Sequence, residues 1–198
     1  MAIKLASIFF TMILVDNYVL AKFLGICPFL GVSKKLDSAV GMSLAVTFVM
    51  VMATAATWPL YMGILAPNGL EYLQTIVFIL VIASLVQLLE NFLKKFIPAL
   101  YKSLGVYLPL ITTNCTILGV TILNLDNGYS FPESIVCAAG AGIGFLVAMV
   151  LFSGVRRKVE QAIVPECFKG LPITLVAAAM TSLSFMGFGG IVEAIFGV

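Results

Sequence analysis

The chain alternates between long apolar runs and short polar connections. Six runs are long enough to cross the hydrocarbon core of a bilayer, which takes about 20 residues. They lie at roughly 5–33, 39–66, 73–93, 103–123, 134–155 and 171–195. The second, fourth and fifth runs contain no charged residue. This pattern predicts an all-α integral membrane protein with six transmembrane helices in a single membrane domain, residues 1–198.

The composition agrees with this class and narrows the chemistry. The chain is 62% hydrophobic and 10% charged, with a mean hydropathy of +1.16, which is too apolar for a soluble domain. A net charge of +2 says nothing about nucleic acid, and we expect no nucleic-acid partner. The absence of histidine excludes histidine-ligated zinc or haem and histidine acid–base catalysis. Because the connections are short, the chemistry must occur in the membrane or on partner subunits.

Lysine and arginine occur in alternate connections between the predicted spans. The first, third and fifth connections carry Lys34, Lys35, Lys94, Lys95, Lys102, Arg156, Arg157, Lys158 and Lys169. The second and fourth connections, around residues 67–69 and 126–128, carry none. Positively charged loops of membrane proteins stay in the cytoplasm. The pattern therefore predicts a multi-pass protein with both termini outside.

A short cysteine motif occurs twice. Residues 27–32 and residues 115–120 both read Cys-x-x-Leu-Gly-Val. Six spans divide into two halves, repeat one at about 1–97 and repeat two at about 98–198, and three spans per half force the second half to be inverted. The motifs then occupy spans one and four. Inverted repeats with interrupted helices at matching positions mark a site near the bilayer midplane, although chance could also produce so short a match.

Residues that interrupt helices lie beside both cysteines. Pro28 directly follows Cys27, and proline removes a backbone donor and disfavours helix at the preceding residue. In the second copy, Pro109 precedes a polar run at 112–114. Irregular backbone at membrane depth is tolerated only where protein or a cavity covers it. We therefore expect each motif to form a half-helix that ends near its cysteine.

Cysteine thiolates in an apolar site need a compensating positive centre. Iron–sulfur clusters supply one and usually take four cysteines. Cys27 and Cys115 would provide two, so a second subunit of the same architecture would provide the others. Zinc also accepts four thiolates, and a lone buried cysteine ordinarily behaves as a small hydrophobe. We expect this ordinary role for Cys137 and Cys167, which have no counterparts in the repeat.

Other polar residues within the spans have two interpretations each. Asp16 lies in the middle of span one, where an ionisable residue is a candidate for ion or proton handling or for structural bonding. Lys22 is six residues further on, so we do not expect the two to form an ion pair. Residues 140–144, Gly-x-x-x-Gly, predict a close helix contact. Sodium ligation or bonding to the interrupted backbone would suit Thr112, Thr113 and Asn114.

Longer stretches around these residues resemble a known family. They are Val-Asp-Asn-Tyr-Val-Leu at 15–20, Lys-Phe-Leu-Gly-Ile-Cys-Pro-Phe at 22–29, Gly-Val-Ser-Lys-Lys at 31–35, Leu-Pro-Leu-Ile-Thr-Thr-Asn-Cys at 108–115 and Ser-Phe-Met-Gly-Phe at 184–188. Over nearly its whole length the chain resembles the RnfA/NqrE family. These are paired six-helix membrane subunits of the Rnf complex and of the sodium-pumping NADH:quinone oxidoreductase.

The resemblance implies a function that spacing alone does not. It implies an electron-relay subunit of a redox-driven Na⁺ or H⁺ pump that passes electrons from ferredoxin to NAD⁺ in a bacterial or archaeal cell membrane. A homologous, RnfE-like subunit would share an intramembrane [2Fe–2S] cluster with it, and Cys27 and Cys115 match the cysteine positions of that motif. Flavins and NAD would bind other Rnf subunits. The alternative is a small inverted-repeat secondary transporter, which needs no matched cysteines.

Overall fold

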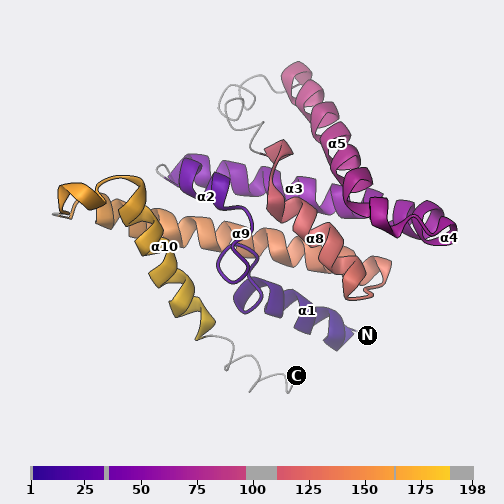
Figure 1. The fold of residues 1–198 in the computed structure, drawn as a ribbon, viewed down its shortest axis with the longest axis horizontal. Helices are drawn as coiled ribbons and strands as arrows, with labels where there is room; N and C mark the ends of the chain where they lie inside the picture. Colours follow the sequence, from indigo (N-terminus) through magenta and orange to yellow (C-terminus); the bar gives the residue numbers. More distant parts are fainter. Residues whose placement is uncertain (1, 34–35, 97–110, 163, 188–198) are drawn as a thin grey trace.

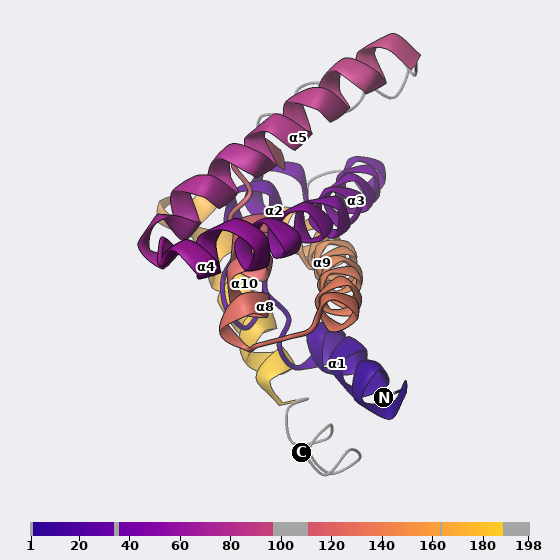
Figure 2. The same ribbon diagram turned by 90° about the vertical axis from the view of Figure 1, so that its right-hand side faces the viewer.

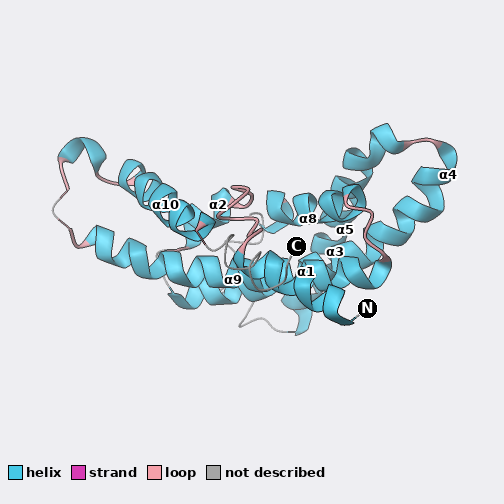
Figure 3. Cartoon of the chain, turned by 90° about the horizontal axis from the view of Figure 1, so that it is seen from below, coloured by secondary structure: helices cyan, strands magenta, loops and turns pink. Residues whose placement is uncertain are grey.

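The computed structural model describes residues 2–33, 36–96, 111–162 and 164–187, and these residues form helices and loops without any strand (Figure 3). In chain order the elements are α1 (Ala2–Leu14), α2 (Ile26–Val32), α3 (Leu36–Leu60), the π-helical turn η1 (Tyr61–Leu65), α4 (Ala66–Asn68), the 3₁₀ turn η2 (Glu71–Leu73), α5 (Gln74–Phe96), α8 (Cys115–Asp126), α9 (Phe131–Glu160), the 3₁₀ turn η3 (Glu166–Phe168) and α10 (Leu171–Met186).

Helices α3 and α9 pack side by side and form the centre of the molecule (Figure 1). Buried residues on α3 recur every three or four positions, which is the period of one helix face. They include Ala39, Met42, Val46, Val49, Met50 and Ala53. On α9, Gly142 faces Thr47 of α3 so closely that a Cβ atom at position 142 would overlap the threonine side chain. The missing side chain therefore permits the close contact between the two helices.

Helix α1 packs on α9 at the predicted Gly-x-x-x-Gly face. A Cβ atom at Gly140 would lie 3.1 Å from the carbonyl oxygen of Phe9, and one at Gly144 would lie 2.9 Å from that of Met12. Small residues allow helix backbones to approach in this way within membranes. The predicted helix contact at 140–144 is confirmed, and it fixes α1 against the middle of α9.

The remaining helices surround this centre. Helix α8 contacts α3, α5 and α9, and α10 contacts α9. Helix α5 contacts α3 and α8, and one of its ends extends beyond the other helices (Figure 2). Large apolar side chains on α5 are exposed, among them Ile76, Leu80 and Leu88. In a bilayer such a surface faces lipid or another apolar protein surface rather than water.

Three continuous helical stretches are long and apolar enough to cross a membrane: Leu36–Asn68, Glu71–Phe92 and Phe131–Glu160. They coincide with the predicted spans two, three and five. Shorter apolar helices at Lys4–Leu14, Cys115–Asp126 and Leu171–Met186 fall within predicted spans one, four and six. Residues 103–110 of span four, with Pro109, and residues 188–195 of span six lie outside the described residues. The all-helical membrane class is thus confirmed, and six spans in two inverted repeats remain a prediction.

Candidate functional site

The first cysteine motif begins a short helix. Helix α1 ends at Leu14, and the backbone then runs through an irregular segment, the first-motif loop, residues 15–25. Helix α2 starts at Ile26, so Cys27 and Pro28 lie in its first turn. The expectation that a half-helix ends at Cys27 is therefore wrong. Proline lacks only an N–H group that a first turn leaves unpaired in any case, so Pro28 favours a helix start at this position.

The second motif also begins a helix, but its interruption is much shorter. Ile111 and Thr112 are helical, Asn114 has extended backbone angles, and Cys115 is the first residue of α8. The side-chain oxygen of Asn114 accepts a hydrogen bond from the Thr116 N–H at 3.0 Å. This N-cap satisfies a donor that the start of a helix otherwise leaves free. Here helical backbone ends at Thr112 and α8 starts at the cysteine.

The two motifs meet each other. The backbone N–H of Gly25 donates a hydrogen bond to Cys115 Sγ at 2.9 Å. Gly25 has a left-handed backbone with φ +83°, and a Cβ atom there would overlap Thr116 Oγ1. Next to it, the Leu24 side chain packs against Gly119, one turn further along α8. The loop before Cys27 therefore lies directly on the helix that begins with Cys115.

This meeting point lies near the middle of the longest described helix. A Cβ atom at Gly25 would also approach the ring of Phe145 at 3.2 Å, and Phe145 is halfway along α9, which has 30 residues. A helix of that length spans about 45 Å. The two motifs are therefore at a similar distance from both ends of α9, at the depth expected of a bilayer midplane when α9 spans the membrane.

From this meeting point α2 and α8 run toward opposite ends of α9. At the end of α2, the Arg156 guanidinium, near the C-terminus of α9, donates to the Leu30 carbonyl oxygen and to Ser33 Oγ, the latter at 2.8 Å. The C-terminus of α8 leads into the loop before α9, where Trp58 Nε1 donates to the Tyr129 carbonyl oxygen at 3.1 Å. The two short helices thus diverge, as inverted repeats require.

Contacts from distant helices hold the first-motif loop. Asn17 is buried; its amide nitrogen donates to the Gly144 carbonyl oxygen at 2.8 Å, and its amide oxygen accepts from the Val19 N–H at 3.1 Å. Ser182 of α10 donates to the Leu20 carbonyl oxygen at 2.5 Å. Asn17 was not among the predicted site residues. The sequence could have indicated Asn17, because it is a polar amide next to Asp16 within an apolar run.

The expectation that Asp16 and Lys22 do not form an ion pair is wrong. Lys22 Nζ lies 3.7 Å from Asp16 Oδ1, and it also lies 5.0 Å from the centre of the Tyr18 ring. The expectation assumed a continuous helix, whereas α1 ends before Asp16 and the loop turns back on itself. Both side chains are partly exposed. Ion or proton handling by Asp16, and sodium ligation at 112–114, stay predictions.

Both motif cysteines are exposed, whereas Cys137 is fully buried and packs in the core. Cys167 is exposed in η3, at the end of the molecule where α9 and α10 are connected. Within the described residues no group of three or more cysteine or carboxylate side chains could hold a metal ion by itself. Cys27 and Cys115 thus present two thiols on the surface of an apolar bundle, and their role as metal ligands stays a prediction.

The fold defines a class: an all-helical membrane protein, here with two exposed cysteines in repeated motifs. The family model described as "Rnf-Nqr subunit, membrane protein" matches residues 5–192. The chain therefore belongs to the Rnf-Nqr family.

Curated relatives carry names from one kind of complex. The chain is 55% identical to a Syntrophotalea carbinolica protein named as part of an "Ion-translocating oxidoreductase complex", over 91% of this chain and 93% of the relative. It is 53% identical to an Acetobacterium woodii protein named as part of a "Na(+)-translocating ferredoxin:NAD(+) oxidoreductase complex", over 94% and 97%. A relative from Aliivibrio salmonicida, with the same name as the first, is 51% identical over 91% and 94%. All three names refer to the same subunit of such a complex.

Proposed function

We propose that this chain is the corresponding membrane component of an ion-translocating ferredoxin:NAD⁺ oxidoreductase, in which it relays electrons within the membrane. Cys27 and Cys115 supply two thiolate ligands of a [2Fe–2S] cluster, and a homologous, RnfE-like subunit supplies the other two. Ferredoxin, NAD and flavins bind other subunits. The ion exported is sodium or a proton. The names of the relatives support the complex, and the geometry of the two motifs supports the cluster.

One observation carries the assignment of the ligands: the Gly25 N–H donates to Cys115 Sγ. Backbone N–H donors to sulfur stabilise the electron-rich sulfur of thiolate-ligated clusters and adjust their potential. Cys115 is also the first residue of a 12-residue helix, and the positive end of a helix dipole stabilises a negatively charged group such as a thiolate-ligated cluster. A secondary transporter has no need for two thiols arranged in this way, so the electron-relay function is favoured over that alternative.

The residues around the thiols have separate tasks. Gly25 donates to sulfur, Asn114 caps α8 and thereby fixes the position of Cys115, and Leu24 packs against α8 at Gly119. When bound, the cluster supplies one-electron transfer. Because both cysteines are exposed on the bundle, the homologous subunit can approach the site without unfolding either chain.

The contacts at the two ends of α9 support the proposed topology. Lys4 and Glu133 form an ion pair at 2.7 Å, so the N-terminus lies beside the connection that has no lysine or arginine. Arg156 joins the end of α2 to the lysine- and arginine-rich end of α9. The alternating charge of the connections therefore agrees with contacts between segments that are distant in the sequence. We propose that the charged end is cytoplasmic and that both chain termini are outside.

The experiment replaces each cysteine by serine in the complex purified with its membrane partners. Cys27→Ser and Cys115→Ser each abolish the membrane [2Fe–2S] signal in electron paramagnetic resonance and visible spectra, because a hydroxyl is a poor replacement for thiolate at iron. Cys137→Ser and Cys167→Ser are the matched controls and retain the signal. Iron content per complex, measured on the same samples, falls by two atoms only in the first pair. A cluster that survives Cys27→Ser with normal iron content would contradict the proposal.

A further inference from the structure

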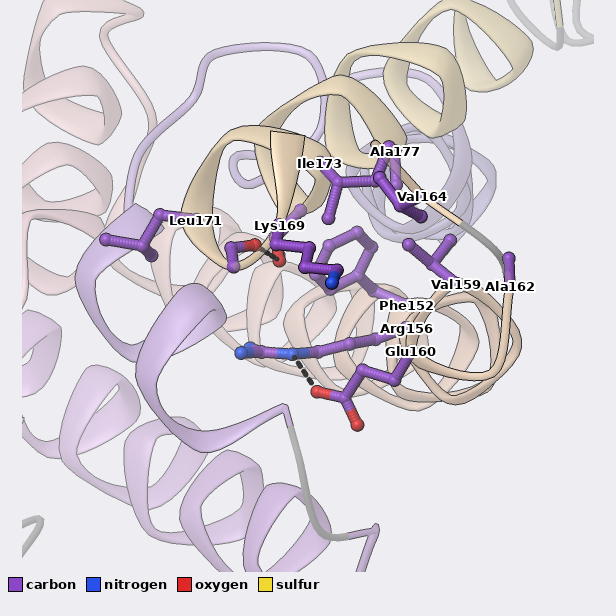
Figure 4. Close-up of a pocket in the computed structure, with 12 residues that line it drawn as sticks. Phe152, Arg156, Val159, Glu160, Ala162, Val164, Lys169, Leu171, Ile173 and Ala177 are labelled. Atoms are coloured by element: carbon purple, nitrogen blue, oxygen red, sulfur yellow. Dashed lines mark hydrogen bonds and ion pairs between the residues drawn. The ribbon is translucent and has the colours of Figure 1, made fainter. Parts of the chain in front are cut away.

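A cavity of about 380 Å³ opens between α9 and α10 at the end of the bundle opposite Lys4 (Figure 4). Arg156 and Glu160 of α9 line one side, and Lys169, just before α10, lines the other. Apolar side chains complete the wall, among them Phe152, Val159 and Ala177. The cavity adjoins the end of α2 through Arg156, but neither Cys27 nor Cys115 lines it, and it has no part in the proposed electron relay.

The two cationic side chains of this cavity differ in burial and in the number of bonds that they already make. Arg156 is 6% exposed; its Nε donates to Glu160 at 3.3 Å and its Nη1 donates to Leu30 and Ser33. A guanidinium has five N–H donors, so among the described residues these three bonds leave the two donors of Nη2 for another acceptor. The Lys169 side chain is 64% exposed and is loosely paired with Glu166 at 3.7 Å. The cavity can thus offer donors from two cations to one anion.

A second, apolar cavity of about 500 Å³ continues from the first along α9 and α10. The two cavities share Val159 and Ala177 as lining residues, and the second then extends along Leu151, Met180 and Phe185. A cationic chamber at the membrane surface and an apolar groove below it match the two parts of a phospholipid. A free anion would use only the first cavity, and an apolar peptide would not need the cations.

We propose that the α9–α10 groove binds an anionic phospholipid, with the phosphate beside Arg156 and Lys169 and an acyl chain along Ala177 and Met180. Anionic lipids are enriched at the cytoplasmic surface, and basic pockets between transmembrane helices at that surface bind their headgroups. The cavity lies at the lysine- and arginine-rich end of α9, so it has the position and the charge of such a basic pocket. The inference rests on the proposed topology, with the charged end of α9 in the cytoplasm, and it is independent of the iron–sulfur cluster.

The test uses the complex in phosphatidylcholine vesicles that contain a small fraction of photoactivatable phosphatidylglycerol or photoactivatable phosphatidylcholine. Crosslinked peptides are identified by mass spectrometry. We expect phosphatidylglycerol to label 151–162 and 171–186 several times more strongly than phosphatidylcholine. Lys169→Gln should reduce this labelling severalfold, because it removes one of the two cations that line the cavity. Lys158→Gln, which removes an exposed cation of the same region outside the cavity, should leave it within twofold.

Two further variants make the proposal refutable without relying on Arg156, which also fixes α2. Glu160→Gln removes a carboxylate from the cavity and should increase the labelling. Ala177→Phe fills the junction of the two cavities without a change of charge and should reduce it. Equal labelling by both lipids would overturn the proposal. Competition by glycerol phosphate together with full labelling of Ala177→Phe would do so as well, because it would mean a site for free anions only. Cluster spectra of the same samples test the proposed electron relay, so a failure of that function can be told apart from a failure of lipid binding.

Discussion

The two cysteine motifs share a sequence core, yet they interrupt their helices in different ways. The second interruption is local: Asn114 caps α8 through its own side chain, and its N–H donates to the Ile111 carbonyl oxygen at 3.2 Å. The first covers eleven positions, 15–25, and depends on Gly144 and Ser182, which lie far along the chain. Both cysteines therefore lie in the first turn of a helix. One is placed there by a short break that its own side chains cap, and the other by a long loop that contacts with distant helices hold in place.

The largest effect is expected where the two motifs touch. Gly25→Ala places a Cβ atom on Thr116 Oγ1 and forces a left-handed backbone on a residue with a side chain, and these effects together cost more than about 2 kcal/mol. We expect loss of the cluster signal and a lower thermal midpoint of the purified complex. Gly31→Ala is the matched control, because nothing lies within 4 Å of a Cβ atom there. Equal behaviour of the two variants would mean that the motifs do not meet at Gly25.

The next effect concerns the long loop alone. Asn17→Ala removes the bond to Gly144 and leaves the buried Val19 N–H without its side-chain acceptor, at a cost of about 1–3 kcal/mol. Differential scanning fluorimetry should show a lower midpoint, and limited proteolysis should cut within 15–25. Asn68→Ala is a suitable control, since that asparagine is exposed and bonds only to Ile64 within its own turn. Protection of the loop in Asn17→Ala would show that α10 suffices to hold it.

The smallest effect is expected at the short break. Asn114→Ala removes one N-cap, which costs about 1 kcal/mol, and α8 keeps its packing against α3 and α9. We expect a complex that assembles and retains its cluster, with a modest decrease in thermal midpoint and a shifted cluster potential in a redox titration. Asn114→Asp keeps the acceptor and should restore the midpoint. A loss as large as that of Asn17→Ala would remove the distinction between a local and a distantly supported break.

Sequence reasoning predicted those features that depend on composition and repetition. Uninterrupted apolar runs predicted the long helices α3 and α9, and the Gly-x-x-x-Gly spacing predicted a close helix contact, which α1 makes. The repeat placed Cys27 and Cys115 at matching positions, and the structure brings their motifs together through Gly25.

Other features depend on contacts that the sequence does not display. The end of α1 before Asp16 depends on the bond between Asn17 and Gly144 and on α10, so the Asp16–Lys22 ion pair could not be predicted from helical spacing. The direction of α2 could have been predicted, because Pro28 suits a first turn. The sequence showed Arg156 only as a positive charge in the fifth connection. Nothing in it indicated that this arginine bonds to the end of α2.

The dependence of the first-motif loop on Gly144 and Ser182 also sets an order of events during biosynthesis. Ribosomes release the N-terminal segment first, yet Asn17 finds its acceptor only after residue 144 has been made, and Leu20 finds its donor only after residue 182. The earliest part of the chain is consequently among the last to reach its final form. Under the proposed function, any factor that delivers iron and sulfide to Cys27 would then act on a completed polypeptide rather than on a nascent one.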